Sequence, residues 1–384
     1  GIALKMRKKD RSVLLARAPR NVAMATEIAV TRPLVPSRAE IDDPEELAWL
    51  ADELAKAWPG SAKAHGSNPV SMSRSSLESF NAKDYLVALK SDGVRYTLFL
   101  CTRPDRSPMA TMMDRAGHAY EVEVMAPEGY FEHRTILEGE MVWKAADTDS
   151  FFFFLFDAIR VEGRALTSLP FCERIREVER LARHSEEIHA LNDMKEMEVR
   201  IAETGSLVIP PHDPEIEIRW KRFVDAAFAD AVWSTRAEAQ HRVDGLILNR
   251  SDAPYRCGTA SGGVAYKWKP HHTVDLTGPS DALECLECPI ADCFPGRSVK
   301  VIASKIDSER AEDEVAEYMI DPSEAGVVKL WALRKRPDKC APNGCKVLKA
   351  TLQDALDDII PGEISAARGG KSTRARKRVR GHRA

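Results

Sequence analysis

The sequence has no long apolar run. The longest, Phe151 to Phe156, is far shorter than the roughly 20 apolar residues that a membrane-spanning helix needs. No hydrophobic signal segment is visible near residue 1. We therefore expect no helical membrane anchor, no secretory signal and no membrane partner.

The usual glycine-rich phosphate cradles are also missing. No G-x-x-x-x-G-K-[ST] segment occurs, and no Rossmann fingerprint is present. These absences exclude a P-loop NTPase and a classical dinucleotide-binding protein. Any phosphate that the chain binds must instead be held by Lys and Arg side chains.

Cysteine is sparse, with 8 in 384 residues, so the chain is not a disulfide scaffold. Cys285, Cys288 and Cys293 form a C-x2-C-x4-C cluster, and Cys340 and Cys345 follow further along. This grouping fits no standard zinc-knuckle spacing, which favours reduced structural or surface thiols over a zinc site. Reduced thiols suit the nucleus, the cytosol or a viral factory.

Acidic residues are missing from the C-terminal end. Residues 368–384 contain eight Lys or Arg and no acid, so the net charge of −3 leaves −11 on residues 1–367. A basic arm on an acidic body indicates nucleic-acid binding or a localisation signal. A solvated tail without a specific role is the alternative.

Composition and periodicity divide the chain into four parts. We expect a basic, poorly ordered segment at 1–37, an α+β domain at 38–275, a small β-barrel with a closing helix at 276–362 and a basic, disordered tail at 363–384. In the α+β domain we expect a first helix at 42–58, later helices at 170–191 and 220–240, and strands at 85–90, 96–101, 119–125, 136–143, 151–159, 244–250 and 265–270.

Lys90 ends one of the predicted strands and is followed at once by Ser91-Asp92-Gly93. Taken alone, this segment is typical of a surface lysine beside a β-turn. Two further carboxylates, Glu138 and Glu140, are two residues apart on another predicted strand and therefore share one face. Exposed strand charges would look the same in sequence.

Three more charged segments follow in order. Asp244 precedes a glycine and an apolar strand, where a metal ligand and an ordinary turn aspartate cannot be told apart. Lys267 and Lys269 share a strand face, and their mutual repulsion favours an anion between them. Arg334 and Arg336 alternate in the same way. Cations that hold phosphates and carboxylates that hold Mg²⁺ together indicate nucleotidyl or phosphoryl transfer.

The order of these segments resembles the covalent nucleotidyltransferases, the superfamily of mRNA capping guanylyltransferases and ATP-dependent ligases. The matching segments are KSDGVR (90–95), EGE (138–140), FFFFLFDAI (151–159), DGLI (244–247), KWK (267–269) and RPDK (336–339). Within the superfamily, NPVSMSRSSLESF, TMMDRAGHAY, LWALRKRPDKCAPN and the segment ending in HHTVDL resemble the capping enzymes more than the ligases. The resemblance covers about 68–359.

The resemblance implies an ATP-grasp-like α+β nucleotidyltransferase domain with antiparallel sheets and helices, followed by a C-terminal OB-fold β-barrel. It also implies a guanylyltransferase that uses GTP and Mg²⁺ or Mn²⁺, forms a lysyl-N-GMP intermediate and caps a 5′-diphosphate RNA. A polynucleotide ligase that forms lysyl-AMP is the alternative, and a non-catalytic RNA- or polymerase-binding protein is a third. The implied partners are RNA polymerase or a separate RNA triphosphatase and cap methyltransferase.

The resemblance assigns roles residue by residue. Lys90 would be the nucleophile and Asp244 the metal ligand, and Lys267 and Lys269 would hold the α-phosphate. We expect nearby cations to lower the pKa of Lys90. The remaining nucleotide contacts implied are Arg95; Arg115 and Glu140 at the ribose; Phe156 and Ile247 around the guanine; Lys221, whose alignment is looser; and Arg336, Asp338 and Lys339 at the β,γ-phosphates.

Overall fold

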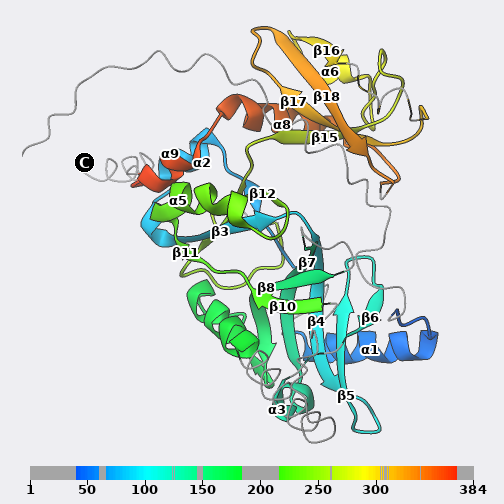
Figure 1. Ribbon diagram of the computed structural model, residues 1–384, viewed down its shortest axis with the longest axis vertical. Coiled ribbons are helices and arrows are strands. Elements are labelled where there is room, and N and C mark those ends of the chain that lie inside the picture. Colours follow the sequence, from blue (N-terminus) through cyan, green and yellow to red (C-terminus); the bar gives the residue numbers. More distant parts are fainter. Residues whose placement is uncertain are drawn as a thin grey trace, which may run out of the picture. The chain divides into compact units, whose positions relative to one another are not determined.

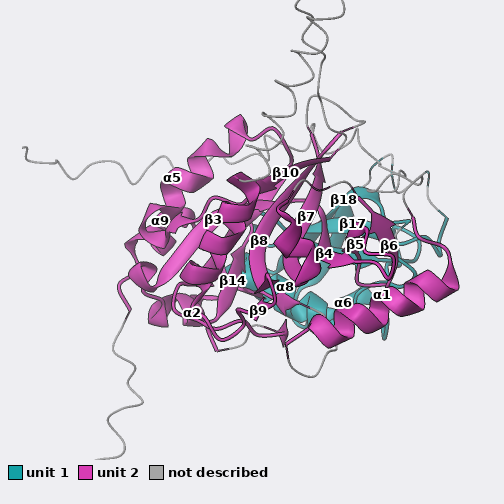
Figure 2. Cartoon of the chain, turned by 90° about the horizontal axis from the view of Figure 1, so that it is seen from below, with its two compact units in different colours: residues 1–32, 271–356 teal, residues 33–270, 357–384 magenta. Residues whose placement is uncertain are grey.

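The computed structural model describes residues 40–59, 66–122, 124, 126–144, 150–183, 216–259, 262–302, 304, 306, 309, 311–337 and 339–369. These residues form a mixed α/β protein whose sheets are mainly antiparallel (Figure 1). They divide into two compact units, one of 40–270 with 357–369 and one of 271–356 (Figure 2). The sequence predicts the second domain at 276–362.

The larger unit has two long helices, α1 and a helix at 171–183, and several short ones. α1 begins at Pro44, where the Asp43 side chain caps it by accepting a hydrogen bond from the Glu45 amide, and it ends at Ala57. This confirms the helix expected at 42–58. The other named helices of this unit are α2 (Arg74–Ser79), α3 (Glu128–Glu132), α5 (Ala229–Ser234) and α9 (Pro361–Ala366), and residues 171–183 are also helical.

A seven-stranded sheet forms one part of the larger unit. Its strands run in the order β10-β8-β7-β4-β5-β6, with β9 beside β8. Their bounds are β4 (Val94–Thr102), β5 (Pro108–Met113), β6 (Ala119–Glu121), β7 (Thr135–Trp143), β8 (Phe151–Val161), β9 (Arg164–Ala165) and β10 (Ile216–Trp220). Leu98, Leu137 and Phe153 are fully buried in the core on one side of this sheet.

A five-stranded sheet forms the other part. Its order is β11-β3-β12-β14-β2, and its bounds are β2 (Val70–Ser71), β3 (Tyr85–Ser91), β11 (Val224–Asp225), β12 (Val243–Arg250) and β14 (Ala265–Trp268). Apolar side chains of β3 and β12, including Val87, Leu246 and Leu248, are buried in a separate core. A two-stranded pair of β1 (Ser67–Asn68) and β13 (Gly258–Thr259) completes the unit.

The helix expected at 220–240 is wrong. β10 runs to Trp220 and Val224–Asp225 pairs with β3 as β11, so the chain is extended where helical spacing predicted a turn of helix. A 3-10 turn (Ala226–Phe228), α5 and a second 3-10 turn (Thr235–Glu238) then follow as separate pieces. Pairing with a neighbouring strand has outweighed the local periodicity here.

The smaller unit is a four-stranded sheet with helices. Its strand order is β15-β17-β18-β16, with bounds β15 (His272–Leu276), β16 (Ser298–Ile302), β17 (Ala316–Asp321) and β18 (Val327–Lys335). α6 (Ile290–Cys293) and α8 (Cys345–Asp357) pack on a core that contains Phe294, Tyr318 and Leu330. The expected OB-fold stays a prediction for this segment.

Among the residues that the structure describes, none of the helices is both long and apolar enough to cross a membrane. The segment 1–37 lies outside the described residues, and so do residues 370–384 of the basic tail and the part of the predicted 170–191 helix beyond 183.

Candidate active site

Lys90 lies where the chain passes from the five-stranded sheet to the seven-stranded sheet. β3 ends at Ser91 and β4 begins at Val94, so only Asp92 and Gly93 connect the two sheets. A Cβ atom on Gly93 would lie 2.1 Å from the Met141 carbonyl oxygen, which is why only glycine fits. Arg242 Nε lies 3.0 Å from Asp92 Oδ2 and anchors the turn.

One carboxylate bridges two lysines at this junction. Lys90 Nζ donates to Asp244 Oδ1 at 2.9 Å, and Lys269 Nζ lies 2.6 Å from Asp244 Oδ2. The three side chains come from three neighbouring segments of one sheet, β3, β12 and the residue after β14. The structure thus brings together three residues that the sequence predicted for one site, and their catalytic roles stay predictions.

A β-bulge explains how Asp244 reaches Lys90. Gly245 pairs directly with Lys90, and the register between β12 and β3 shifts between Val243 and Gly245. The extra residue at this shift is Asp244, and a bulge redirects the side chain that it carries. A Cβ atom on Gly245 would lie 2.0 Å from the Trp268 carbonyl oxygen, so the Asp-Gly step is needed for β14 to approach.

The prediction that nearby cations lower the pKa of Lys90 is wrong. Burial acts to lower the pKa of Lys90, but the neighbouring carboxylates of Asp244 and Glu140 outweigh it and raise the pKa above its ordinary value. The pKa of Asp244 is lowered: burial opposes its charge, but the ammonium groups of Lys90 and Lys269 outweigh burial. The lysine is therefore held protonated by its own site.

The two glutamates of β7 hold two more cations on the same face. Glu140 Oε2 accepts from Lys221 Nζ at 2.6 Å, and both side chains are largely buried. Glu138 Oε1 forms an ion pair with Arg95, at 2.5 Å from Nη2, and accepts a hydrogen bond from the Tyr255 hydroxyl at 2.9 Å. The pairing of Arg95 with Glu140 across β4 and β7 places both ion pairs beside each other.

Phe156 presents its ring to these cations. Arg95 lies over the Phe156 ring at 5.1 Å from its centroid and Lys221 at 6.0 Å, within the range of cation–π attraction. Phe156 is half-buried, whereas Phe151 and Phe153 are buried in the core. The role of Phe156 against a guanine ring stays a prediction.

Three further residues were predicted for the site. Two of them lie on the five-stranded sheet with Lys90, and the third follows β5 of the seven-stranded sheet. Ile247 is half-buried on β12 and pairs with Ala88 on one side and Lys267 on the other, so these side chains share a face with Lys90. Arg115 follows β5 and donates from Nη2 to Asn68 Oδ1 at 2.6 Å. Their roles toward a nucleotide stay predictions.

The last motif belongs to the smaller unit. Arg336 Nη1 lies 3.0 Å from Asp275 Oδ1, and Asp275 N in turn donates to Asn343 Oδ1 at 2.9 Å. Lys339 is exposed, and its amide donates to the Arg336 carbonyl at 3.0 Å. Asp338 lies outside the described residues. Because this motif and Lys90 belong to different units, its role at the β,γ-phosphates stays a prediction.

Two residues beside the site were not singled out from the sequence. His241 Nε2 lies 3.0 Å from Ser91 Oγ, and its ring lies 4.7 Å from that of Phe154. Tyr255 is buried against Glu138. His241 stands just before the VDGLIL segment, and Tyr255 lies inside the segment that resembles capping enzymes, but neither position has a charge pattern that reveals its partner.

The chain is similar to a protein family and to solved structures. The family model "mRNA capping enzyme, catalytic domain" matches residues 41–271, which contain Lys90, Asp244 and Lys269. The "mycobacterial DNA ligase D complexed with ATP and MES" is a similar solved structure, with a TM-score of 0.42 and 15% identity, covering 71% of this chain and 95% of that one.

Curated relatives point in the same direction. The chain is 22% identical to an mRNA-capping enzyme of Caenorhabditis elegans over 77% of its own length and 47% of the relative's. It is 26% identical to an mRNA-capping enzyme subunit alpha of Yarrowia lipolytica over 55% of its length and 52% of the relative's. The chain spans about half the length of these relatives. With more than half of its residues matched by the family model, it belongs to the mRNA capping enzyme family, whose catalytic domain it contains.

Proposed function

We propose that the chain is an mRNA guanylyltransferase that transfers GMP from GTP, through Lys90, to the 5′-diphosphate end of RNA. The observation that carries this proposal is the Lys90–Asp244–Lys269 group, in which the Nζ atoms lie 2.9 and 2.6 Å from the carboxylate. A buried lysine beside a second cation and a metal-binding type of carboxylate is the arrangement that a covalent nucleotidyl transfer needs. Membership of the capping family supports GTP as the nucleotide.

In the first step the Lys90 amine forms a bond to the α-phosphorus, and the bond from that phosphorus to the bridging oxygen breaks, so pyrophosphate leaves. The amine must first lose to solvent the proton that Asp244 and Glu140 stabilise. Asp244 would hold a divalent cation, and its carboxylate would then no longer stabilise the ammonium. Burial and the charge of Lys269 then favour the neutral amine.

The other predicted residues would bind and orient the nucleotide. Lys267 and Lys269 would hold the α-phosphate, and Phe156 with Ile247 would enclose the guanine ring. Arg115 and Glu140 would bind the ribose hydroxyls, and Arg95 and Lys221 would add positive charge. In support, Lys267 pairs in register with Ile247, and Arg95 and Lys221 already flank Phe156.

The donor set fits a divalent cation such as Mg²⁺ or Mn²⁺. Mg²⁺ usually binds through one or two carboxylates together with substrate phosphates and water, so a single carboxylate at the phosphate site is sufficient. Asp244 is that carboxylate, and Glu140 lies close enough to influence Lys90. When bound, the cation would neutralise charge on the α-phosphate and on the departing pyrophosphate.

In the second step the terminal phosphate of the RNA attacks the lysyl-GMP, the nitrogen–phosphorus bond breaks, and GpppN-RNA is released. We further propose that the smaller unit is an OB-fold that carries Arg336, Asp338 and Lys339 to the β,γ-phosphates. Cap formation would also need an RNA triphosphatase and a cap methyltransferase, with RNA polymerase as a further partner, and we expect the nucleus or a cytoplasmic viral factory as the location.

Incubation with α-labelled GTP and, separately, ATP in the presence of Mg²⁺ tests the proposal. We expect a covalent adduct with GTP that maps to Lys90 and is absent from Lys90→Met. Lys83, which is exposed on the 3-10 turn before β3, offers a matched control, and Lys83→Met should label normally. Labelling by ATP alone would favour the ligase alternative, and no label from either nucleotide would indicate a non-catalytic binding protein.

The role proposed for Lys339 separates the two half-reactions. Lys339→Ala should abolish lysyl-GMP formation from GTP, because it removes the side chain that would bind the departing pyrophosphate. It should spare GMP transfer from preformed lysyl-GMP to RNA, since no pyrophosphate is then present. Both rates can be followed with labelled GMP, and an equal loss in both would contradict this role.

A further inference from the structure

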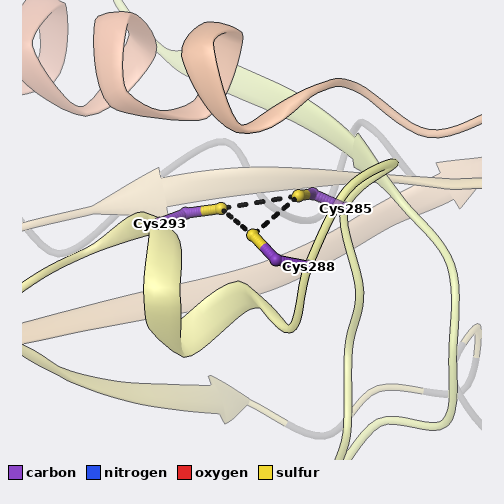
Figure 3. A group of neighbouring side chains, drawn as sticks. All are labelled: Cys285, Cys288 and Cys293. Atoms are coloured by element: carbon purple, nitrogen blue, oxygen red, sulfur yellow. Dashed lines mark hydrogen bonds between the residues drawn. The ribbon is translucent and has the colours of Figure 1, made fainter.

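Three cysteine thiols meet in the smaller unit, and none of them is among the residues proposed for catalysis. Cys285 and Cys288 lie in the loop before α6, and Cys293 is the last residue of that helix (Figure 3). Their Sγ atoms form a triangle with sides of 3.4 Å (Cys285–Cys288), 3.6 Å (Cys288–Cys293) and 3.5 Å (Cys293–Cys285). All three are free cysteines.

A fourth cysteine joins them from a distant part of the sequence. Cys345 is the first residue of α8, its amide donates to Glu287 Oε2 at 2.6 Å, and its thiol interacts with those of Cys288 and Cys293. The four thiols therefore come from one loop-helix segment and from the start of another helix. Two segments held together in this way are typical of structural zinc sites.

The sulfur–sulfur distances distinguish between the possible states of such a cluster. A disulfide requires about 2.0 Å between sulfurs. A tetrahedral zinc ion with Zn–S bonds of about 2.3 Å separates its sulfurs by about 3.8 Å. The measured 3.4 to 3.6 Å lies close to the zinc tetrahedron and far from a disulfide.

The surrounding backbone holds the two segments in place. Leu286 N donates to the Asn343 carbonyl at 3.1 Å, and Glu287 Oε2 accepts from Cys345 N at 2.6 Å. Gly344 also lies close to this side chain, since a Cβ atom there would be 2.7 Å from Glu287 Oε1. The ligand-bearing segments are thus positioned by contacts other than those among the thiols.

The charge around the cluster also suits a metal–thiolate centre. Four thiols that bind Zn²⁺ release four protons, and the resulting centre carries two negative charges. Cys345 opens a 13-residue helix, whose N-terminus favours negative charge, and Lys349 adds a positive charge one turn later. Both features would stabilise such a centre.

We propose that Cys285, Cys288, Cys293 and Cys345 bind one structural Zn²⁺ ion. Four protein ligands leave no open position, so the ion joins the α6 loop to α8 and takes no part in catalysis. The C-x2-C-x4-C spacing by itself favours plain thiols, because it supplies only three ligands at no standard spacing. We assign the fourth ligand to Cys345, which follows Cys293 only after three strands of the sheet.

Metal analysis of the full-length chain, purified under reducing conditions from zinc-supplemented cells, tests this proposal. We expect about one zinc per chain, and a loss of about tenfold or more in Cys288→Ser and Cys345→Ser. Cys340→Ser is the matched control, because Cys340 is exposed and free and lies five residues before Cys345. It should retain the zinc.

A second measurement does not depend on variants that fold poorly. Unaltered chain loaded with Co²⁺ in place of zinc should show the charge-transfer and intense visible bands of tetrahedral cobalt–thiolate coordination. GTP labelling of the larger unit in the same preparation reports separately on the proposed catalytic function. Folded unaltered chain that holds neither zinc nor cobalt, or a Cys340→Ser variant that loses metal as Cys345→Ser does, would overturn the zinc site.

Discussion

Lys90 is subject to two opposing effects on its charge. Burial favours the neutral amine, and the carboxylates of Asp244 and Glu140 favour the ammonium, which prevails in the chain without ligands. The cations that the sequence suggested as neighbours are present, but Lys269 already has Asp244 as its partner. Activation of the nucleophile therefore depends on what happens to Asp244 when the nucleotide and cation bind.

Asp244→Asn should lower the pKa of Lys90, because it removes the carboxylate nearest to the ammonium. A lower pKa leaves more free amine at any pH below it, so Lys90 should react severalfold faster with an amine-modifying reagent at a fixed, mildly alkaline pH. Mass spectrometry of the modified peptide measures this rate. The same variant should fail to form lysyl-GMP. Slower modification of Lys90 would contradict the effect assigned to Asp244.

His241 predicts a second pH effect. Burial, with a contribution from Lys221, lowers the pKa of His241 from 6.5 to about 4. The unfolded chain therefore binds a proton at His241 as the pH falls from about 6.5 to about 4, whereas the folded chain does not. The contribution of His241 to the free energy of unfolding is therefore fully present above about pH 6.5. It falls as the pH is lowered from about 6.5 to about 4.

Replacing His241 tests this effect on stability. His241→Gln keeps a polar atom for Ser91 and should flatten the fall in the free energy of unfolding across the acidic window. The gain at the acidic end should be below about 3 kcal/mol, because each pKa unit corresponds to about 1.4 kcal/mol and partial exposure reduces it. Urea denaturation at both ends of the window measures the difference. An unchanged slope would show that His241 does not titrate as described.

At the level of elements, the link between β3 and β4 positions the nucleophile. Gly93→Ala should destabilise the larger unit by about 1 to 3 kcal/mol, because the new Cβ atom meets the Met141 carbonyl oxygen and must push β4 from β7. It should also reduce lysyl-GMP formation, since Lys90 and Arg95 flank the displaced turn. Urea denaturation and GTP labelling give the two readouts.

Gly362→Ala is the matched control for this substitution. Gly362 lies in α9, and a Cβ atom there would meet nothing within 4 Å. The change should leave labelling intact and stabilise the helix by up to about 1 kcal/mol. Equal behaviour of the two variants would contradict the steric role of Gly93.

The sequence predicted the strands with alternating charge. It also predicted a helix at 220–240, which does not form as one helix. Glu138 and Glu140 share one face of β7, as period-two spacing predicts. Asp244 instead reaches Lys90 through a bulge, which strand spacing does not reveal. The segment at 224–225 joins a sheet because β3 offers an edge there, and such a partner is distant in sequence. The partners of His241 and Tyr255 could not be predicted either, because Ser91 and Glu138 are also distant in sequence.

For the whole molecule, two compact units and a basic tail are the features with consequences for function. The motif order predicted that the catalytic residues fall in one unit and Arg336 in another, since the motifs are separated by a Gly-Pro turn at 278–279. The sequence grouped Cys285, Cys288 and Cys293 but did not single out Cys345, the proposed fourth ligand, which lies beyond β17 and β18. The spacing of cysteines along the chain does not show which distant cysteine the fold brings beside Cys293.

The tail prediction is tested by RNA binding at several salt concentrations. Removing 370–384 deletes seven Lys or Arg but retains Gly369, whose amide donates to the Phe80 carbonyl at 2.9 Å. We expect weaker binding and a shallower dependence of log affinity on log salt, by about 0.7 for each phosphate of single-stranded RNA that the tail no longer neutralises. A full-length chain with these seven residues changed to Gln should behave like the deletion, since charge and not length supplies the effect. An unchanged slope in both variants would mean that the tail does not bind RNA.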